Sequence, residues 1–450
     1  MKSLFLILMF SGAAFCGASG LSMTGVDDFK QLARSGKIVD KTLLIKDLIE
    51  RNDLVTLITR PRRFGKSTNL SMLWRFFALE HDPIEAKENR DLFETRKIRN
   101  EARIFENYQG KCPSIFLSFK DVNGETLEEL TRKLKAAVSL EFRRHVYLTT
   151  NLERNNPLGA SSDLKKFRSL LLNDGREASK ADLERSLQFL SQLLSEYHSG
   201  KPVCVFIDEY DAPLHKAFKN GHLTDGTELI QNLFLALLKN NPVLDRAIIT
   251  GIFHLSEADL FSGINNIVED SVIRGPYASH YGFTETDLDD LFWGSMQESK
   301  DRFKKMYRGY KFYNGLKGTP LIDIYNPWSA IGFLKNNGVY ENYWISTGET
   351  ELLDDLILLQ GVQNSLNLLL SRRTIHLKIP KDITLIGSRG RPEALWPLLF
   401  HTGYLTLADV PVFNEHSNEY EVDLVVPNIE ILSAYSQFYR QFRQNNKYSR

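Results

Sequence analysis

A glycine–lysine–serine triplet carries the clearest chemical signal in the sequence. Gly65, Lys66 and Ser67 stand between an apolar run, 54–59, and a segment with one apolar helical face. In a phosphate-binding loop the glycine lets the backbone approach oxygen atoms, the lysine reaches the β- and γ-phosphates, and the serine hydroxyl ligates Mg²⁺. Arg60 replaces the first glycine that such loops usually have, so the triplet alone is a weak signal.

Two adjacent carboxylates supply the second half of the expected site. Asp208 and Glu209 follow the apolar run 203–207. Beside a phosphate-binding loop, the first carboxylate holds Mg²⁺ and a following glutamate polarises the attacking water. The alternative is an ordinary strand end with two solvated acids. Because both motifs stand at strand ends and in the expected order, we favour a nucleotide site at the carboxyl ends of a parallel sheet.

The basic turn 60–63 has two rival interpretations, a processing site in an exported protein and an anion patch for nucleic acid. A processing protease needs an extended and exposed loop, whereas a phosphate-binding loop is enclosed between its strand and its helix. Trp328, Trp344 and Trp396 are expected to be core anchors rather than platforms for nucleic-acid bases. A nucleic-acid partner is therefore only weakly supported.

Four short apolar segments are expected to be the strands that position these motifs: 54–59, 114–119, 203–207 and 247–253. Amphipathic helical patterns separate them, whereas the polar stretch 151–175 is expected to include an exposed loop. Strands that alternate with helices form a parallel sheet with helices on both faces. The expected fold class is therefore α/β, of the P-loop NTPase type, over residues 21–285.

The sequence after this domain changes character. A mostly helical lid region is expected over 286–380, with an aromatic-rich turn at 307–315. A winged-helix-like module is expected over 381–442, and a basic tail over 443–450. The module's expected elements are a helix at 394–401, two strands of a hairpin at 403–407 and 420–426, and a last helix after Pro427.

Residues 1–20 have the pattern of a cleavable secretory signal peptide. Lys2 precedes the apolar run 4–10, and small residues follow it up to Gly20. The alternative, an uncleaved anchor, is disfavoured because a membrane span needs about 20 apolar residues. We expect cleavage after Ala18 or Gly20, a secreted protein, and no transmembrane segment in the rest of the chain.

The composition is that of an ordinary soluble globular protein. The 450 residues are 42% hydrophobic and 25% charged, and 56 basic residues balance 56 acidic ones. The zero net charge argues against a protein that binds nucleic acid through bulk charge. Of the three cysteines, Cys16 leaves with the signal peptide, and Cys204 is expected to be an inert buried thiol in its apolar strand. Cys112 precedes another strand, and its pairing with Cys204 is left open.

Several segments together resemble the AAA-ATPase-like family of P-loop proteins. They are Asp40–Thr42, Thr59–Ser67, Phe116–Phe119, Ile207–Pro213, Thr250–Gly251, Phe261–Asn266, Tyr281–Glu285, Tyr325–Trp328 and Tyr343–Ile345. The resemblance covers about Val39 to Ile429. In that family the Arg-Pro-Arg-Arg-Phe form of the loop is normal, which accounts for Arg60.

The resemblance implies an ATPase, a hydrolase with ATP and Mg²⁺ as cofactors and a nucleotide as its partner. Ser67 and Asp208 would ligate the metal, and Glu209 would be the catalytic residue. The cofactor-binding residues that it implies are Arg62, Arg63, Phe64, Gly65, Lys66, Ser67 and Thr68.

Two departures from the family limit what the resemblance implies. Relatives have an arginine after the fourth strand and a lysine three residues later, where this chain has His254 and Glu257. A cation near the γ-phosphate is worth about 10³- to 10⁵-fold in rate, so weakened hydrolysis is expected unless His254 has only a packing role. Many relatives also continue into a restriction-endonuclease-like domain. No Asp with a Glu-x-Lys pair follows the expected hairpin, so no nuclease activity is expected.

Two functions from different classes follow. The first is an ATP-binding P-loop protein that acts as an ATPase. The alternative is a secreted, non-hydrolysing interaction protein that keeps the fold. A DNA-directed role rests on the winged-helix-like module alone, because a fold by itself does not give a function.

Overall fold

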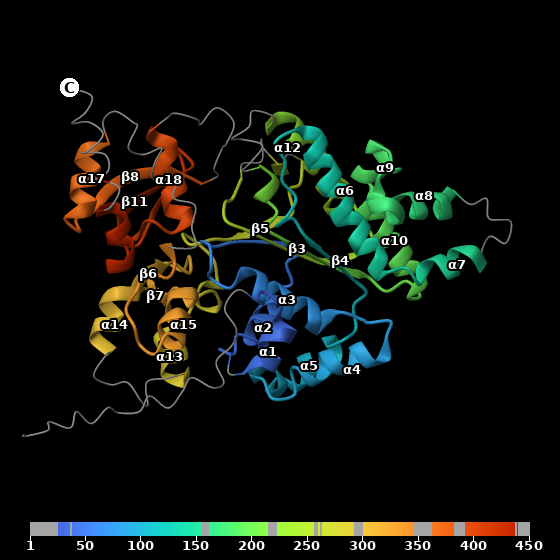
Figure 1. The fold of residues 1–450 in the computed structure, drawn as a ribbon, viewed down its shortest axis with the longest axis horizontal. Coiled ribbons are helices and arrows are strands. Elements are labelled where there is room, and N and C mark those ends of the chain that lie inside the picture. Colours follow the sequence, from blue (N-terminus) through green and yellow to red (C-terminus); the bar gives the residue numbers. More distant parts are fainter. Residues whose placement is uncertain are drawn as a thin grey trace, which may run out of the picture.

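The computed structural model (Figure 1) describes residues 26–36, 38–154, 162–214, 223–255, 260–261, 263–291, 300–345, 362–381, 392–436 and 439. The expected signal peptide, Glu257 and the basic tail lie outside these residues. An α/β part and a smaller C-terminal part, drawn in orange and red, lie next to each other (Figure 1). Within the described ranges, no helix has both the length and the apolar character that a membrane span requires.

A parallel five-stranded sheet forms the centre of the α/β part. Its strands are β1 (Val55–Thr59), β2 (Ser114–Ser118), β3 (Val203–Asp208), β4 (Leu244–Gly251) and β5 (Ile267–Asp270), in the order β2-β3-β4-β1-β5. The expected fold class and its four expected strands are confirmed, and β5 is an additional edge strand. We call the side at which these strands end the carboxyl edge and the side at which they begin the amino edge.

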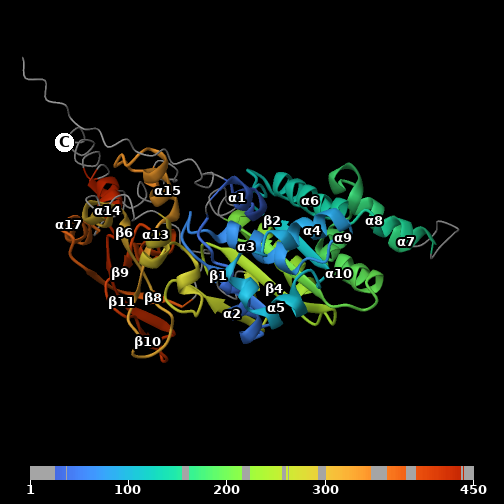
Figure 2. The same ribbon diagram turned by 90° about the horizontal axis from the view of Figure 1, so that it is seen from below.

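Alternate residues of the strands supply two separate hydrophobic clusters. In β3, Val205 and Ile207 belong to one cluster, and Cys204 and Phe206 belong to the other. Burial on both faces is the reason that the central strands are almost continuously apolar. The helices of the first cluster are α6 (Leu127–Arg144), α10 (Ser186–Tyr197) and α12 (Leu223–Leu238), and those of the second are α1 (Phe29–Ser35), α2 (Leu43–Arg51), α3 (Lys66–Phe77) and α5 (Ala102–Tyr108). Figure 1 shows the sheet edge-on between these two groups of helices, and Figure 2 views it from the side on which α2, α3 and α5 lie.

The polar stretch 151–175, which we expected to include an exposed loop, is largely helical where the structure describes it. Leu164, Phe167 and Leu170 are buried at a spacing of three residues, so they form one apolar stripe on a helix. The stripe packs in the first cluster with α6. The peripheral helices are α4 (Pro83–Asp91), α7 (Leu148–Arg154), α8 (Ser162–Leu171) and α9 (Lys180–Glu184).

A short antiparallel hairpin divides the region that we expected to be a mostly helical lid. β6 (Arg308–Phe312) pairs with β7 (Ile322–Tyr325), so the aromatic run that we expected to be a turn begins as a strand. Its alternate residues, Tyr310 and Phe312, are buried. Asn326 then caps a helix by accepting a hydrogen bond from the Ser329 amide at 3.2 Å. The helices around this hairpin are α13 (Glu285–Leu291), α14 (Lys300–Tyr307) and α15 (Pro327–Lys335).

The C-terminal module combines a small antiparallel sheet with helices. The expected pairing of its two hairpin strands is confirmed, because β9 (Thr406–Leu407) pairs with β11 (Glu419–Val425). β11 also pairs with β8 (Ile375–Pro380), which precedes the expected start of the module at residue 381. The remaining elements are α17 (Gln363–Leu370), α18 (Pro392–Thr402), β10 (Val412–Asn414) and a helix over 429–436.

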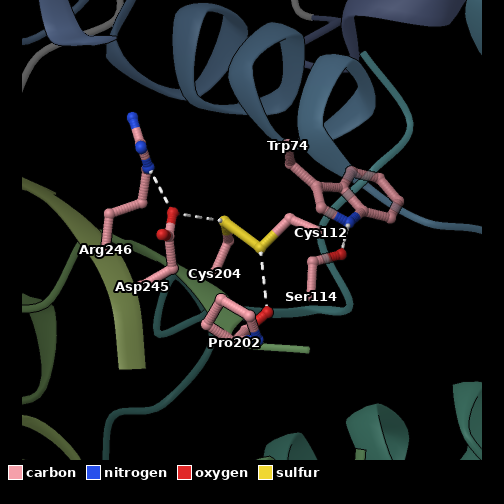
Figure 3. Close-up of a disulfide and its surroundings, with 7 residues drawn as sticks. All are labelled: Trp74, Cys112, Ser114, Pro202, Cys204, Asp245 and Arg246. Carbon is pink, nitrogen blue, oxygen red and sulfur yellow. Dashed lines mark hydrogen bonds and ion pairs between the residues drawn. A yellow bond between two sulfur atoms is a disulfide. The ribbon is translucent and has the colours of Figure 1, made fainter. Parts of the chain in front are cut away.

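Cys112 and Cys204 form a disulfide at the amino edge, as Figure 3 shows. The interpretation of Cys204 as an inert thiol was therefore wrong. The reason is spatial: β2 and β3 are neighbours, and Ser114 pairs with Cys204 in their register, which brings the preceding residues of β2 beside the start of β3. Strand order, which the sequence does not state, decides whether two such cysteines meet.

Candidate functional site

A sharp loop joins β1 to α3 at the carboxyl edge. Arg63 and Gly65 both have left-handed backbones, with φ of 66° and 84°. Gly65 directly precedes α3 and has no side chain to cap it, and glycine adopts this conformation without strain. The first N–H groups of a helix have no partners within it, and the helix dipole favours an anion there. The loop therefore provides an anion site between β1 and α3.

Lys66, the first residue of α3, is folded back over this loop. Its side chain is buried, and its Nζ donates a hydrogen bond to the Pro61 carbonyl at 3.0 Å. Burial lowers the pKa of Lys66, whereas the negative charges of Glu209, Asp211 and Asp208 act in the opposite direction. An additional anion at the loop would stabilise the charged ammonium.

Asp208, at the end of β3, meets the loop directly. Thr250 Oγ1 of β4 donates to Asp208 Oδ1 at 2.6 Å, and the Ser67 hydroxyl lies close enough to the carboxylate to influence its pKa. Burial raises the pKa of Asp208, while the hydroxyls of Thr250 and Ser67 lower it. The structure thus brings together the hydroxyl and the carboxylate that the sequence proposed as metal ligands. Both are oxygen donors, which Mg²⁺ prefers.

Glu209 stands beside this pair with a left-handed backbone, φ 51°. Burial is the main cause that raises the pKa of Glu209, and the neighbouring charge of Asp208 adds to it, while Lys66 opposes it. A carboxyl group whose pKa is raised toward neutrality is suited to accept a proton from water. The structure therefore places the expected catalytic residue at the same edge as Lys66 and Asp208.

The two residues after Glu209 hold the end of β4, a role that sequence reasoning did not assign. Asp211 Oδ2 accepts hydrogen bonds from the amides of Ile252 and Phe253 at 2.9 and 3.0 Å. Tyr210 Oη donates to the Phe253 carbonyl at 2.6 Å and accepts from the Leu255 amide at 3.2 Å. The recurrence of an aspartate soon after Asp208 was the signal available in the sequence, but only the fold shows what it binds.

Arg60, which replaces the usual glycine, is a buried anchor of the loop. Its guanidinium forms an ion pair with Asp270 at the end of β5 and donates to the carbonyls of Thr59 and Asp270 at 2.7 and 2.9 Å. It also lies 5.0 Å from the ring centre of Tyr281 and 5.4 Å from that of Phe312. The charge of Arg60 is therefore directed into the protein, where it fixes the start of the loop to β5.

The next residues of the loop contact the C-terminal part of the chain. The Arg62 carbonyl accepts a hydrogen bond from Trp344 Nε1 at 3.2 Å, and the Arg63 guanidinium lies 4.3 Å above the ring of Trp328. Phe64 is fully buried and packs edge-on against Tyr310. The Phe64 side chain therefore anchors the loop, and only its backbone lies where a ligand at the loop could reach.

A cavity of about 150 Å³ adjoins the loop between α1, α3 and α15. Gly65 and Thr68 line it beside apolar groups such as Met72, Phe283 and Trp328. Ligand pockets usually measure about 300–1,000 Å³, so this cavity has room for one end of a nucleotide rather than for all of it. Its position next to Gly65 connects it with the anion site at the start of α3.

His254, the departure after β4, lies between β5 and the C-terminal module. Its Nδ1 is 3.5 Å from Glu269 Oε2, and both side chains are about nine-tenths buried. Burial, with a smaller contribution from His254, lowers the pKa of His401 of α18 to about 3. These neighbours supply His254 with packing and with an acidic partner, so its surroundings do not single out a role at the phosphate.

The chain is similar to known proteins in sequence and in fold. A family model described as "Predicted AAA-ATPase" matches residues 23–261, more than half of the chain. An uncharacterized protein from the vnfD 5′ region of Azotobacter chroococcum mcd 1 is 25% identical over 403 residues, which are 88% of this chain and 65% of that protein. The chain thus spans less than two thirds of that relative's length. Among solved structures, the Walker-type ATPase PABY2304 of Pyrococcus abyssi matches with a TM-score of 0.41 and 15% identity, over 89% of this chain and 96% of that one.

Proposed function

Because the chain belongs to the AAA-ATPase-like family of predicted AAA-ATPases, we propose that it binds ATP with Mg²⁺ at the carboxyl edge and hydrolyses it. The observation that carries this proposal is that the Ser67 hydroxyl and the Asp208 carboxylate lie beside each other at the carboxyl edge. These residues stand far apart in the chain, and they are the pair whose oxygens would ligate Mg²⁺. When bound, Mg²⁺ neutralises charge that develops on the β- and γ-phosphate oxygens.

The residues of the loop would bind the phosphates. Lys66 would exchange the Pro61 carbonyl for phosphate oxygens, which offer the buried ammonium a full negative charge in place of a dipole. The free amides at the start of α3 would donate to the same phosphates, since Gly65 leaves them open. Glu209 would orient a water molecule and accept its proton, because its carboxylate lies beside Asp208 with a raised pKa.

The adjoining cavity would take the nucleobase. Its apolar walls include Trp328 and Met72, and Gly65 and Thr68 also line it. Arg63 covers one face of the Trp328 ring, so a base would stack from the cavity side. This arrangement would place the ring in apolar surroundings and the phosphates at the helix N-terminus.

Binding and turnover can be measured separately. A fluorescent ATP analogue, titrated with Mg²⁺ present, should bind the parent chain, and Lys66→Ala should weaken that binding about a hundredfold or more because it removes a buried positive charge from the loop's expected phosphate site. Lys87→Ala, at an exposed lysine on α4, is the matched control and should bind normally. Glu209→Gln should retain binding and lose phosphate release. Parent-like affinity of Lys66→Ala would refute the proposed site.

The alternative function, a non-hydrolysing interaction protein, is favoured by the surroundings of His254. This residue faces Glu269, so its charge would be partly neutralised by an acid instead of being directed to a γ-phosphate. Nucleotide binding without phosphate release by the parent chain would support this alternative. The double variant His254→Arg, Glu257→Lys, which restores the family's two cations, should then gain turnover. Hydrolysis of ATP by the parent chain would exclude the non-hydrolysing alternative.

We also propose that the chain is exported with residues 1–20 as its signal peptide. The disulfide between Cys112 and Cys204 supports this proposal, since disulfides persist in oxidising compartments and are rare in the cytosol. Fusion of residues 1–20 to a reporter enzyme should direct the reporter out of the cell. Replacement of two leucines of the apolar run, Leu6 and Leu8, by arginine should abolish that export.

A further inference from the structure

A cluster of two sulfurs and one carboxylate lies at the amino edge, at the opposite end of β3 from Asp208 (Figure 3). Its members are Cys112, which precedes β2, Cys204 of β3 and Asp245 of β4. The two Sγ atoms and a carboxylate oxygen all lie within 4.8 Å of one another. The nucleotide site proposed above uses none of these groups.

We propose that this cluster, once its disulfide is reduced, is a Zn²⁺ site with Cys112, Cys204 and Asp245 as ligands. A dithiol reductant supplies two electrons and two protons, which convert the disulfide into two thiols while the reductant becomes a disulfide itself. Zn²⁺ then displaces one proton from each thiol and binds the two thiolates and the carboxylate. The pair is thus a disulfide under oxidising conditions and a metal site under reducing ones.

The distances fit tetrahedral zinc. Zn–S bonds of about 2.3 Å and Zn–O bonds of about 2.1 Å, at a tetrahedral angle, separate a sulfur from an oxygen by about 3.6 Å. Cys204 Sγ lies 3.6 Å from Asp245 Oδ2. Two sulfur ligands of one zinc stand about 3.8 Å apart, a separation that two unbonded sulfurs adopt once the disulfide opens. The Cα atoms, 6.0 Å apart, need little movement for this change.

The surroundings hold the ligands in place independently of the disulfide. The Cys112 amide donates to the Phe77 carbonyl at 2.9 Å, and the Cys112 carbonyl accepts from the Leu79 amide at 2.8 Å. Cys204 is part of a central strand. Both cysteines therefore keep their backbone positions in the reduced state.

A second layer of contacts orients the oxygen ligand and leaves an open position. Arg246 Nε donates to Asp245 Oδ2 at 2.7 Å, and the Arg246 guanidinium is itself held over the ring of Phe77. Such contacts fix the orientation of a metal ligand. The Pro202 carbonyl lies 3.4 Å from Cys112 Sγ, so its oxygen would be available as a fourth ligand. Asp245 is about one-third exposed, which gives an ion a way in.

The ligand set selects the metal. Thiolates favour Zn²⁺ over hard cations such as Mg²⁺ and Ca²⁺, and the carboxylate makes the site less suited to monovalent copper. Two thiolates and one carboxylate carry three negative charges, which Zn²⁺ and the paired Arg246 guanidinium together balance. Zinc is therefore the cation that this cluster fits best.

The test uses the full chain with Cys16→Ser, so that Cys112 and Cys204 are its only cysteines. After reduction with a phosphine, Zn²⁺ alone is titrated in competition with a chromogenic chelator, and Co²⁺ is used to record the absorption of a tetrahedral thiolate site. One Zn²⁺ should bind per reduced chain, and none should bind to the cluster in the oxidised chain.

Asp245→Asn is the decisive variant because it keeps both cysteines and hence the disulfide that supports folding. It should lower the affinity for Zn²⁺ at least about tenfold and alter the Co²⁺ spectrum. Asp174→Asn, at an aspartate that also pairs with an arginine but on the surface, is the matched control and should bind like the parent. Absence of Zn²⁺ binding by the reduced chain, or parent-like binding by Asp245→Asn, would overturn the proposal.

Discussion

The two edges of the central sheet hold the same strand by different kinds of bond. At the carboxyl edge, β3 ends in Asp208, which a hydrogen bond from Thr250 holds in place. At the amino edge, β3 begins beside a covalent bond between Cys204 and Cys112. Groups at the first edge are ionisable, buried and linked by interactions that a ligand can exchange. The second edge is fixed unless its bond is chemically broken.

Helix α3 connects these two edges, which explains why the difference between them matters. It begins with Lys66 at the loop after β1 and ends with Phe77, whose carbonyl accepts a hydrogen bond from the Cys112 amide. The disulfide therefore holds the far end of the helix whose near end carries the proposed phosphate site. The two edges therefore share one helix, and whether a change at one edge reaches the other can be measured.

The largest effect is expected from the buried ion pair of the carboxyl edge. Arg60→Met should lower the free energy of unfolding by about 3–5 kcal/mol, because it leaves the buried charge of Asp270 without its partner. Chemical denaturation measures this loss. The double variant Arg60→Met, Asp270→Asn should recover part of it, since no uncompensated charge remains. A loss below about 1 kcal/mol in the single variant would show that this edge does not depend on the pair.

The next effect concerns the amino edge. Replacement of both Cys112 and Cys204 by serine should lower the free energy of unfolding by about 2–4 kcal/mol, since the disulfide closes a loop with a sequence separation of 92. Affinity for the ATP analogue, measured under native conditions, should change less than about twofold. If affinity for the ATP analogue falls together with stability, α3 transmits changes from one edge to the other, and the two edges are not independent.

The strands that end at the carboxyl edge were better predicted than the contacts that support this edge. Short β-branched runs indicated β1 to β4 because buried parallel strands have few other patterns, and the ends of β1 and β3 then had to meet at one edge. β5 was missed because Ile267–Asp270 is only four residues long, half of them acidic. Asp270 is the last residue of β5, so the partner of Arg60 was not predicted either.

Contacts between distant segments set the limit of the sequence interpretation. To predict the disulfide, the order of β2 and β3 has to be known. To predict the hydrogen bond from Trp344 to the Arg62 carbonyl, the position of the C-terminal part has to be known. Neither has a local pattern. The hairpin of β6 and β7 was missed for a different reason: its aromatic and glycine residues are typical of a turn, and its alternate burial shows only in the fold.

A pH-dependent contribution is expected from Glu430, which reaches the carboxyl edge through Trp344. Its carboxylate accepts hydrogen bonds from the Ser329 hydroxyl at 2.8 Å and the Trp344 amide at 2.6 Å, and burial raises the pKa of Glu430 to about 7. In the unfolded chain the group titrates near 4.3. The folded state therefore holds a proton that the unfolded state has lost between about pH 4 and 7, so stability falls as pH rises through this window.

The size of this fall is at most about 4 kcal/mol, at 1.36 kcal/mol for each pH unit of the window. Glu430→Gln, which cannot titrate, should flatten the curve of unfolding free energy against pH by that amount. Denaturation of both chains at several pH values across the window measures it. An unchanged curve would mean that the carboxyl group of Glu430 titrates in the folded chain like an exposed one. Its burial would then not lower the stability of the folded chain.

The smallest effect tests whether Asp208 is tuned by its neighbour on β4. Thr250→Val removes the donor to Asp208 Oδ1, so the pKa of the carboxyl group should rise further and Mg²⁺ should bind about tenfold more weakly in the presence of ATP. Thr59→Val on the adjacent strand β1 is the matched control. The Thr59 hydroxyl is equally buried and, among the described residues, has no hydrogen-bond partner, so its loss should leave Mg²⁺ affinity within about twofold. Titration of Mg²⁺ against each variant separates a specific hydrogen bond from a general effect of a β-branched apolar residue at this depth. Equal losses in both variants would mean that packing at the strand ends, and not the hydroxyl of Thr250, sets the affinity of the carboxyl edge for its metal.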